Sequence, residues 1–119
     1  FNLGSLLAND NNDNLKYLPM ITKSHIDFLE KRIDEIEDEL SELKNFILPS
    51  GNKIFSLTQI ARTVCRRAER KLVKLCKDQK NIDLNYVSFI NRLSDYLFVL
   101  SRKFLKDFNV QERYWQKDS

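Results

Sequence analysis

Apolar residues recur along this chain with the period of a helix, most regularly between residues 24 and 48. Their spacing alternates between three and four residues, which is typical of a helix that packs along a narrow seam. The seam consists of Ile26, Leu29, Ile33, Ile36, Leu40, Leu43 and Ile47. Ser24 with Asp27 three residues later resembles a capping box, and the turn PSGN predicts that this helix ends before Pro49. Acidic residues fill its outer faces and indicate a solvated surface rather than a metal or substrate site.

Two longer helices follow, predicted from about Ile54 to Lys77 and from about Asp83 to Leu105. The expected core face of the first consists of Leu57, Ala61, Val64, Ala68, Leu72 and Leu75. That of the second consists of Tyr86, Phe89, Ile90, Leu93, Leu97, Leu100 and Phe104. The stretch YLFVL at 96–100 is apolar nearly all the way round, so we expect it to be buried against another subunit as well as against its own core.

The first residues, FNLGSLLA, resemble the last turns of a helix, because they start on an apolar residue without a cap before it. The run NDNNDN at 9–14 favours turns, so we expect an exposed loop as far as Pro19. The whole pattern predicts an all-α fold.

Composition agrees with one helical domain and narrows its partners. The chain has 119 residues, 42% hydrophobic and 31% charged, with only 2 Gly and 2 Pro. A net charge of +3 is too small to indicate nucleic acid. No apolar run reaches the roughly 18 residues of a membrane span, and no leader pattern is visible. We therefore expect a soluble protein that binds neither nucleic acid nor membrane.

Cys65 and Cys76 lie eleven residues apart on one predicted helix. The helical rise separates them by about 16 Å, which is too far for a mutual disulfide. We expect both to be reduced and the protein to be intracellular.

Cations are concentrated in one short helical stretch, ARTVCRRAERK at 61–71, around the single acid Glu69. The cations are Arg62, Arg66, Arg67, Arg70 and Lys71. Arg62, Arg66 and Glu69 share one flank of their helix, beside its expected core face. A matching row on the next helix contains Asn91, Asp95, Phe98 and Arg102.

Two interpretations of these rows remain open. The arginines could form structural ion pairs, with Asp95 answering one of them across the helix interface. One glutamate and one aspartate do not satisfy so many arginines, however, and arginine forks match phosphate oxygens. A polyphosphate would supply the missing acceptors, and Asn91 could contact the base or sugar of a nucleotide.

The usual catalytic groups are absent from the sequence. His25 is the only histidine and reads as a surface residue, and the two cysteines read as small hydrophobes. The sequence contains no GxxxxGK[ST], GxGxxG or CxxC motif. An enzyme built from this chain would need a substrate that brings its own nucleophile.

Three segments closely resemble the PduO-type corrinoid adenosyltransferases, the ATP:cob(I)alamin adenosyltransferases. They are FILPSG at 46–51, ARTVCRRAER at 61–70 and NRLSDYLFVLSR at 91–102. The resemblance implies homotrimers of five-helix bundles, with ATP, Mg²⁺ and cobalamin bound in clefts between subunits. It implies transfer of the 5′-deoxyadenosyl group of ATP to cob(I)alamin, with triphosphate released. Residues 1–119 would then be the C-terminal two-thirds of the domain, without the first helix and most of the second.

The resemblance also assigns the ATP-binding segment. Arg66, Arg67, Glu69 and Arg70 would bind ATP, with Arg66 contacting the triphosphate and Glu69 organising it or the Mg²⁺. Asn91 would contact the nucleoside.

The remaining implied roles concern the subunit boundary and the corrinoid. Arg62 would pair with an acid of the neighbouring subunit, with Asp95 as a supporting partner. Phe46 would keep the lower axial ligand off cobalt, which makes cobalt(II) easier to reduce. A cobalamin reductase or a cobalamin-dependent enzyme is a further implied partner, in the cytoplasm or the mitochondrial matrix.

Two departures from the family pattern stand out. The N-terminal stretch that wraps the ATP phosphates is absent from this sequence, so we expect a fragment of a longer chain. Asn52 stands where the loop usually carries a second glycine, and asparagine tolerates left-handed backbone.

Two alternatives to the enzyme remain. One is a non-catalytic helical interaction module whose basic helix docks on an acidic partner or RNA, which predicts cations spread over an exposed face. The other is a family member that binds corrinoid only as a chaperone.

Overall fold

The computed structural model describes residues 1–9 and 18–117 and contains four helices in them. They are α1 (Asn2–Ala8), α2 (Lys23–Glu37), α3 (Lys53–Asp78) and α4 (Leu84–Asp107). Apart from one isolated bridge, the described residues form no β structure, so the all-α prediction is confirmed. The predicted turn NDNNDN lies, except for Asn9, outside the described residues.

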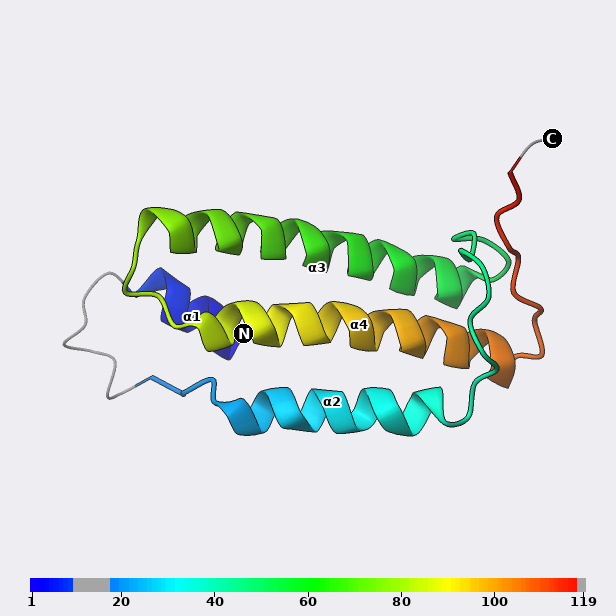
Figure 1. Cartoon of the computed structure of the whole chain (residues 1–119), viewed down its shortest axis with the longest axis horizontal. Helices are drawn as coiled ribbons and strands as arrows, with labels where there is room; N and C mark the ends of the chain where they lie inside the picture. Colours follow the sequence, from blue (N-terminus) through cyan, green and yellow to red (C-terminus); the bar gives the residue numbers. More distant parts are fainter. Residues whose placement is uncertain (10–17, 118–119) are drawn as a thin grey trace.

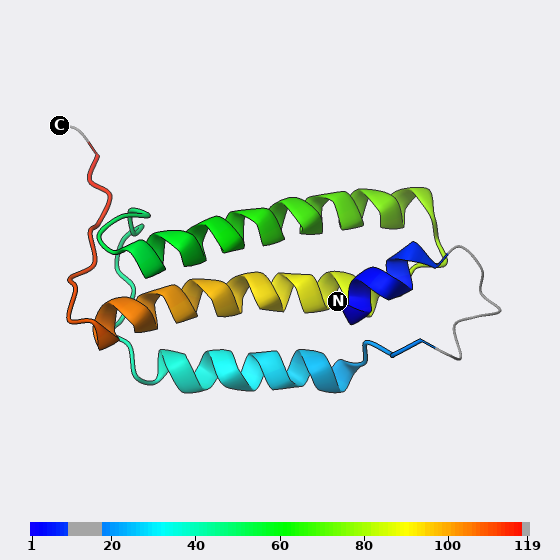
Figure 2. The same cartoon turned by 180° about the vertical axis from the view of Figure 1, so that it is seen from behind.

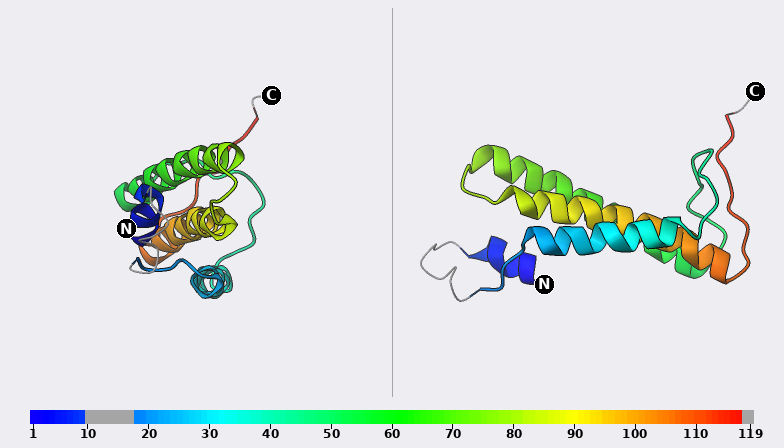
Figure 3. Two further views of the ribbon diagram at one scale, coloured as in Figure 1. Left: turned by 90° about the vertical axis from the view of Figure 1, so that its left-hand side faces the viewer. Right: turned by 60° about the horizontal axis from the view of Figure 1, so that its bottom comes forward.

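The three long helices lie side by side, with α4 between α2 and α3 (Figure 1; Figure 2, from behind). α4 runs antiparallel to α3 and parallel to α2, and it packs against both. The end-on view in Figure 3 shows α2 and α3 on opposite sides of α4. α1 and the residues before α2 cover the first turns of α4 through one apolar cluster. Its members are Leu3, Leu6, Leu18, Ile21, Tyr86, Phe89 and Ile90.

α2 follows the predicted seam over its whole helical length, because Ile26, Leu29, Ile33 and Ile36 are all buried. The predicted capping residue, Ser24, was wrong by two residues. Thr22 is the N-cap, and the Thr22 backbone N–H donates to Nδ1 of His25 at 3.0 Å. His25 therefore completes a capping box on the exposed surface, which agrees with its prediction as a surface residue.

The predicted end of α2 was wrong, because the helix stops at Glu37 and the chain to Leu48 is not helical. Acidic residues at the helix end oppose its dipole. Backbone carbonyls beyond it are taken by side chains of α4: Lys106 donates to the Glu39 carbonyl, and Arg102 donates to that of Ser41 at 2.9 Å. Leu43, expected in the seam, is consequently exposed.

α3 has the predicted length but turns a different face to α4. Only Leu72 of the predicted core face is buried, Leu75 is half-buried, and Leu57, Ala61, Val64 and Ala68 are exposed. The buried positions are Phe55, Gln59, Cys65 and Leu72. α3 rests on α4 alone among the long helices, so a single interface decides which face is covered. The Gln59 amide donates to the Ser101 hydroxyl at 2.8 Å inside that interface.

α4 is contacted from two sides, so its burial is spread around the helix. The predicted core residues are all half-buried, as are most residues of YLFVL. The buried positions are Ser94, Val99, Ser101, Arg102 and Leu105. Two of these five are serines, whose small side chains let the neighbouring helices approach closely.

Helices α3 and α4 both begin at side-chain caps. Asn52 accepts hydrogen bonds from the backbone N–H groups of Ile54 and Phe55, at 2.8 and 3.3 Å, and Asp83 accepts from that of Asn85 at 2.8 Å. Asn52 has extended backbone with φ −154°. The left-handed position of this turn is Gly51, with φ 120°. The asparagine that replaces the family's second glycine therefore serves as a helix cap. The expectation that residue 52 must adopt left-handed backbone was wrong.

Candidate functional site

A chain of polar contacts crosses the interface between α3 and α4. The Asn91 amide nitrogen donates to the Glu69 carboxylate at 2.7 Å, and the Asn91 oxygen accepts from Arg92 at 2.5 Å. The Arg92 guanidinium also pairs with Asp95 at 2.5 Å. We call Glu69, Asn91, Arg92 and Asp95 the interhelix polar chain. The prediction that the two helices carry matching polar rows is confirmed for the Glu69–Asn91 contact.

Arg62 lies half-buried in the same interface with its charge poorly satisfied. Its guanidinium carbon lies 4.8 Å from the centre of the Phe98 ring, in cation–π geometry. Its Nε is buried and has no hydrogen-bond partner among the described residues. Burial lowers the pKa of Arg62, the nearby charge of Arg66 lowers it further, and Asp95 opposes them. The ion pair that Asp95 makes is with Arg92 on its own helix, so the expected structural pair across the interface is not formed.

Three arginines of α3 point away from the bundle. Arg66, Arg67 and Arg70 are exposed and make no ion pair with any residue that the structure describes. Arg66 was expected to border the core, and the rotated face of α3 exposes it instead. Their guanidinium forks remain available to an external anion.

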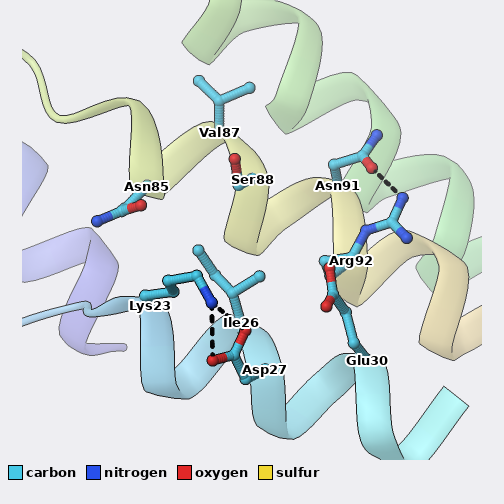
Figure 4. A pocket seen from close by; sticks show the side chains of 9 residues that line it. All are labelled: Lys23, Ile26, Asp27, Glu30, Asn85, Val87, Ser88, Asn91 and Arg92. Carbon is cyan, nitrogen blue, oxygen red and sulfur yellow. Dashed lines mark hydrogen bonds and ion pairs between the residues drawn. The ribbon is translucent and has the colours of Figure 1, made fainter.

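A cavity of about 430 Å³ lies between α2 and α4, with the polar chain at one side (Figure 4). Its wall on α4 includes Asn85, Ser88, Asn91 and Arg92, and its wall on α2 includes Lys23, Ile26, Asp27 and Glu30. Lys23 pairs with Asp27 at 3.1 Å within the wall. Two cations and two acids thus line the cavity, which suits an uncharged polar group such as a nucleoside better than a polyphosphate.

Phe46 lies apart from these residues, in the segment between α2 and α3 at the far end of α4 (Figure 1). Its side chain is 79% exposed. The Phe46 ring meets the Trp115 ring edge to face, with centroids 6.4 Å apart and planes at 73°. The structure therefore divides the predicted site residues into an α3–α4 group and an isolated aromatic.

Sequence reasoning missed Arg92 and Trp115. Arg92 precedes Asp95 by three residues, and that helical spacing could have flagged it. Trp115 had no detectable signal, because it follows the last predicted helix in a polar stretch and its ring partner is far away in the sequence.

Neither cysteine has the surroundings of a nucleophile or a redox pair. Both are free, and Cys65 is buried with its thiol donating to the Ile90 carbonyl at 3.5 Å. Burial raises the pKa of Cys65, and the negative charge of Glu69 adds to this against the opposing charge of Arg66. Within residues 1–9 and 18–117, no group of three or more His, Cys, Asp or Glu side chains is placed to hold a metal ion. None of the helices there combines the length and apolarity needed to cross a membrane.

Comparison with protein families gives one match, to the family described as cobalamin adenosyltransferase, over residues 1–104. The corrinoid adenosyltransferase of Bacillus subtilis is 49% identical over 82 residues, which cover 69% of this chain and 42% of that protein. The human corrinoid adenosyltransferase MMAB is 46% identical over 91 residues, 76% of this chain and 36% of that protein. This chain thus spans less than half the length of these two relatives.

Solved structures match over almost the whole chain. A PduO-type ATP:corrinoid adenosyltransferase from Lactobacillus reuteri superposes with a TM-score of 0.86 at 30% identity, covering 98% of this chain and 64% of that one. That protein is a phenylalanine-to-alanine variant in complex with cobalamin and ATP. An arginine-to-lysine variant in complex with ATP gives a TM-score of 0.86 at 31% identity.

Proposed function

This chain belongs to the cobalamin adenosyltransferase family, and we propose that the full-length protein transfers the 5′-deoxyadenosyl group of ATP to cob(I)alamin. The observation that carries the proposal is the group of exposed arginines on α3, without ion pairs to the described residues, beside a chain of polar contacts that reaches a cavity. The products are adenosylcobalamin and triphosphate. A cytoplasmic or mitochondrial location and a cobalamin reductase or cobalamin-dependent enzyme as partner belong to the same proposal.

The reaction needs no nucleophile from the protein. Cobalt(I) supplies both electrons of the new cobalt–carbon bond, while the bond between the ribose 5′ carbon and its oxygen breaks and triphosphate leaves with that electron pair. The protein must hold the two reactants in line and stabilise the charge of the departing triphosphate. Arginines meet the second need.

Arg66, with Arg67 and Arg70, is proposed to bind the triphosphate. Their forks are free and exposed, and charge-assisted bidentate contacts to phosphate oxygens are among the strongest hydrogen bonds available. Glu69 fits a Mg²⁺ ion that arrives with the nucleotide, because Mg²⁺ takes one or two carboxylates and completes its shell with phosphate and water. When bound, the ion would neutralise part of the phosphate charge.

Asn91 is proposed to contact the nucleoside from the wall of the cavity. Its amide group offers two donors and two acceptor sites, and the contacts to Glu69 and Arg92 leave one of each. The same two contacts fix the orientation of the amide. The remaining donor and acceptor of Asn91 would therefore be presented to a bound nucleoside in one fixed orientation.

We further propose a homotrimer with its sites between subunits. An uncovered apolar strip on the outside of α3 supports association; it consists of Ile54, Leu57, Ile60 and Val64, each 39% to 58% exposed. The orphaned Nε of Arg62 supports the expected pair with an acid of the neighbouring subunit, with Asp95 lending long-range support. Residues 1–119 would form the C-terminal two-thirds of the domain in each subunit.

Phe46 is proposed to occupy the lower face of the corrinoid, where its exposed ring would keep the axial ligand off cobalt. The Lactobacillus reuteri proteins solved as variants carry changes at one phenylalanine and one arginine. These are the residue types to which we assign central roles in Phe46 and Arg66.

Arg66 provides the direct test. We expect Arg66→Ala to reduce adenosylcobalamin formation from ATP and chemically reduced cobalamin at least 100-fold, the loss of about 3 kcal/mol typical of one transition-state contact. Lys74→Ala removes another exposed cation of α3 and serves as the matched control. Absence of product from well-folded wild-type protein would exclude the enzyme and leave the interaction module or the chaperone, which share the exposed arginines. Full activity in Arg66→Ala would exclude the assigned role.

A further inference from the structure

The chain after α4 turns and crosses the end of the bundle (Figure 1). Asn109 adopts left-handed backbone with φ 54°, and the Val110 N–H donates to the Leu105 carbonyl at 2.8 Å. This is the hydrogen bond of a Schellman motif, with asparagine in the position that glycine usually holds. We call residues 110–117 the C-terminal strap. Figures 1 and 2 both show it beside the segment between α2 and α3.

A buried ion pair holds the strap to α4. Arg102 Nε donates to Glu112 Oε1 at 2.7 Å, and the two side chains are only 5% and 13% exposed. Arg102 also donates to the Ser41 carbonyl, and the Tyr114 hydroxyl donates to Glu112 at 2.8 Å. Three segments distant in the sequence therefore share one set of polar contacts.

Backbone pairing then sets the strap against the Phe46 segment in one register. The Leu48 N–H donates to the Arg113 carbonyl at 2.7 Å, and the Trp115 N–H donates to the Phe46 carbonyl at 2.8 Å. The antiparallel bridge between Ile47 and Tyr114 lies between these two bonds. A shift by one residue would break both hydrogen bonds and turn Trp115 to the other side.

The register brings the Trp115 ring edge to face against the Phe46 ring. The two rings, with Leu43, Lys44 and Asn45, line a cavity of about 330 Å³. Phe46 has little else to restrict its side chain, since 79% of it is exposed, and Trp115 is itself held at its backbone. The contact thus limits the orientations of a ring that would otherwise rotate freely.

We infer that Trp115 is a positioning residue for Phe46, holding its ring in the orientation that excludes the lower axial ligand of a bound corrinoid. This inference rests on the proposed function and adds a residue to it. Trp115 would act only on substrates that have a lower ligand to exclude. A corrinoid that lacks the nucleotide tail, such as cobinamide, has no tethered base to exclude and carries only a weakly bound water.

The test compares two corrinoids with full-length protein, ATP and a chemical reductant, starting from cobalt(II). We expect Trp115→Ala to slow adenosylation of cob(II)alamin by about threefold to tenfold, the range that one edge-to-face pair provides. Trp115→Phe, which keeps an aromatic edge, should restore most of the rate. With cobinamide, all three proteins should react equally fast.

Two readouts separate positioning from a general structural defect. The EPR spectrum of cob(II)alamin bound with ATP should show nitrogen coupling from the lower ligand in a larger fraction of Trp115→Ala than of wild type. Adding Trp115→Ala to Phe46→Ala should cause no further loss, because one residue acts through the other. Where Trp115→Ala does not fold, Trp115→Leu gives the same comparison. The fluorescence of Trp115 is a further measurement, obtained as the difference between wild type and Trp115→Phe. It must change when corrinoid binds.

Equal losses with both corrinoids, additive losses in the double variant, or unchanged EPR spectra would each overturn the inference. Unchanged Trp115 emission at saturating corrinoid would also overturn it. Failure of wild-type protein to produce adenosylated product from either corrinoid would instead overturn the proposed function, and the inference with it. Wild-type activity with equal losses leaves the proposed function intact, so the two failures are distinguishable.

Discussion

Cys65 shows how the α3–α4 interface controls the chemistry of a single side chain. Its thiol is buried, donates to a backbone carbonyl and lies near the negative charge of Glu69. Each of these features favours the protonated form over the thiolate. Cys65 therefore acts as a small packing residue, as the sequence predicted.

We expect the raised pKa of Cys65 to make the protein less stable at high pH. Above the ordinary thiol value of 9.0, the unfolded chain loses this proton while the folded chain keeps it. The folded state then binds more protons, so the free energy of unfolding falls as pH rises through the folded pKa. Urea unfolding between pH 7 and 10.5 measures the slope. Cys65→Ala should flatten it, and an unchanged slope would show that other groups, such as Tyr86, cause it.

The sequence predicted the polar residues of α3 that belong to the candidate site better than it predicted the residues that contact them. Helical geometry predicted that Glu69 and Asn91 lie on matching polar rows of their helices, but it did not predict that they pair with each other. Arg92 was missed although its i,i+3 spacing from Asp95 could have flagged it. Trp115 was missed because it lies in a segment that carries no periodic signal. The roles assigned to Arg66 and Phe46 stay proposals.

At the scale of elements, local signals located α3 and α4 to within about two residues of their ends. Asn52 and Asp83 cap them with their own side chains, so the start signals lie within a few residues of the helices they begin. α2 behaved differently because its end is decided by α4. Arg102 and Lys106 bind carbonyls beyond Glu37, and no sequence pattern within α2 reveals donors that distant.

The buried pair between Arg102 and Glu112 should stabilise the strap strongly. We expect Glu112→Ala to cost about 3 kcal/mol, because it leaves an arginine buried without its counter-charge. Chemical denaturation measures this loss. Lys103→Ala, which removes the partly exposed pairs with Asp107 and Glu39, is the control and should change stability far less. A similar effect of both variants would mean that the Arg102 pair is solvated in solution.

At the scale of the whole molecule, periodicity identified residues that share a face but not what covers that face. Leu57, Val64 and Leu72 were predicted to lie together in the core, yet only Leu72 is buried in this chain. The exposed part of the face meets solvent here because α2 and α3 lie on opposite sides of α4 (Figure 3). Covering it requires protein from outside the described residues.

The difference between Leu57 and Leu72 gives a prediction about assembly. We expect Leu57→Glu to keep the helical content of the protein while lowering the fraction of the proposed trimer, because Leu57 is 54% exposed within the subunit. Leu72→Glu should unfold it, because a carboxylate would be buried without a partner. Circular dichroism and light scattering measure the two properties. Unfolding by Leu57→Glu would show that the strip belongs to the core of the subunit itself.

The central helix α4 carries both the contact to α3 and the contact to the C-terminal strap. Asn91 and Arg102 lie on the same helix, about 16 Å apart by helical rise, one contacting Glu69 and the other holding the strap. A rigid rod that carries both transmits any axial displacement from one to the other without an intervening hinge. The Glu69–Asn91 contact and the strap that pairs with the Phe46 segment are therefore held at a fixed spacing by one helix.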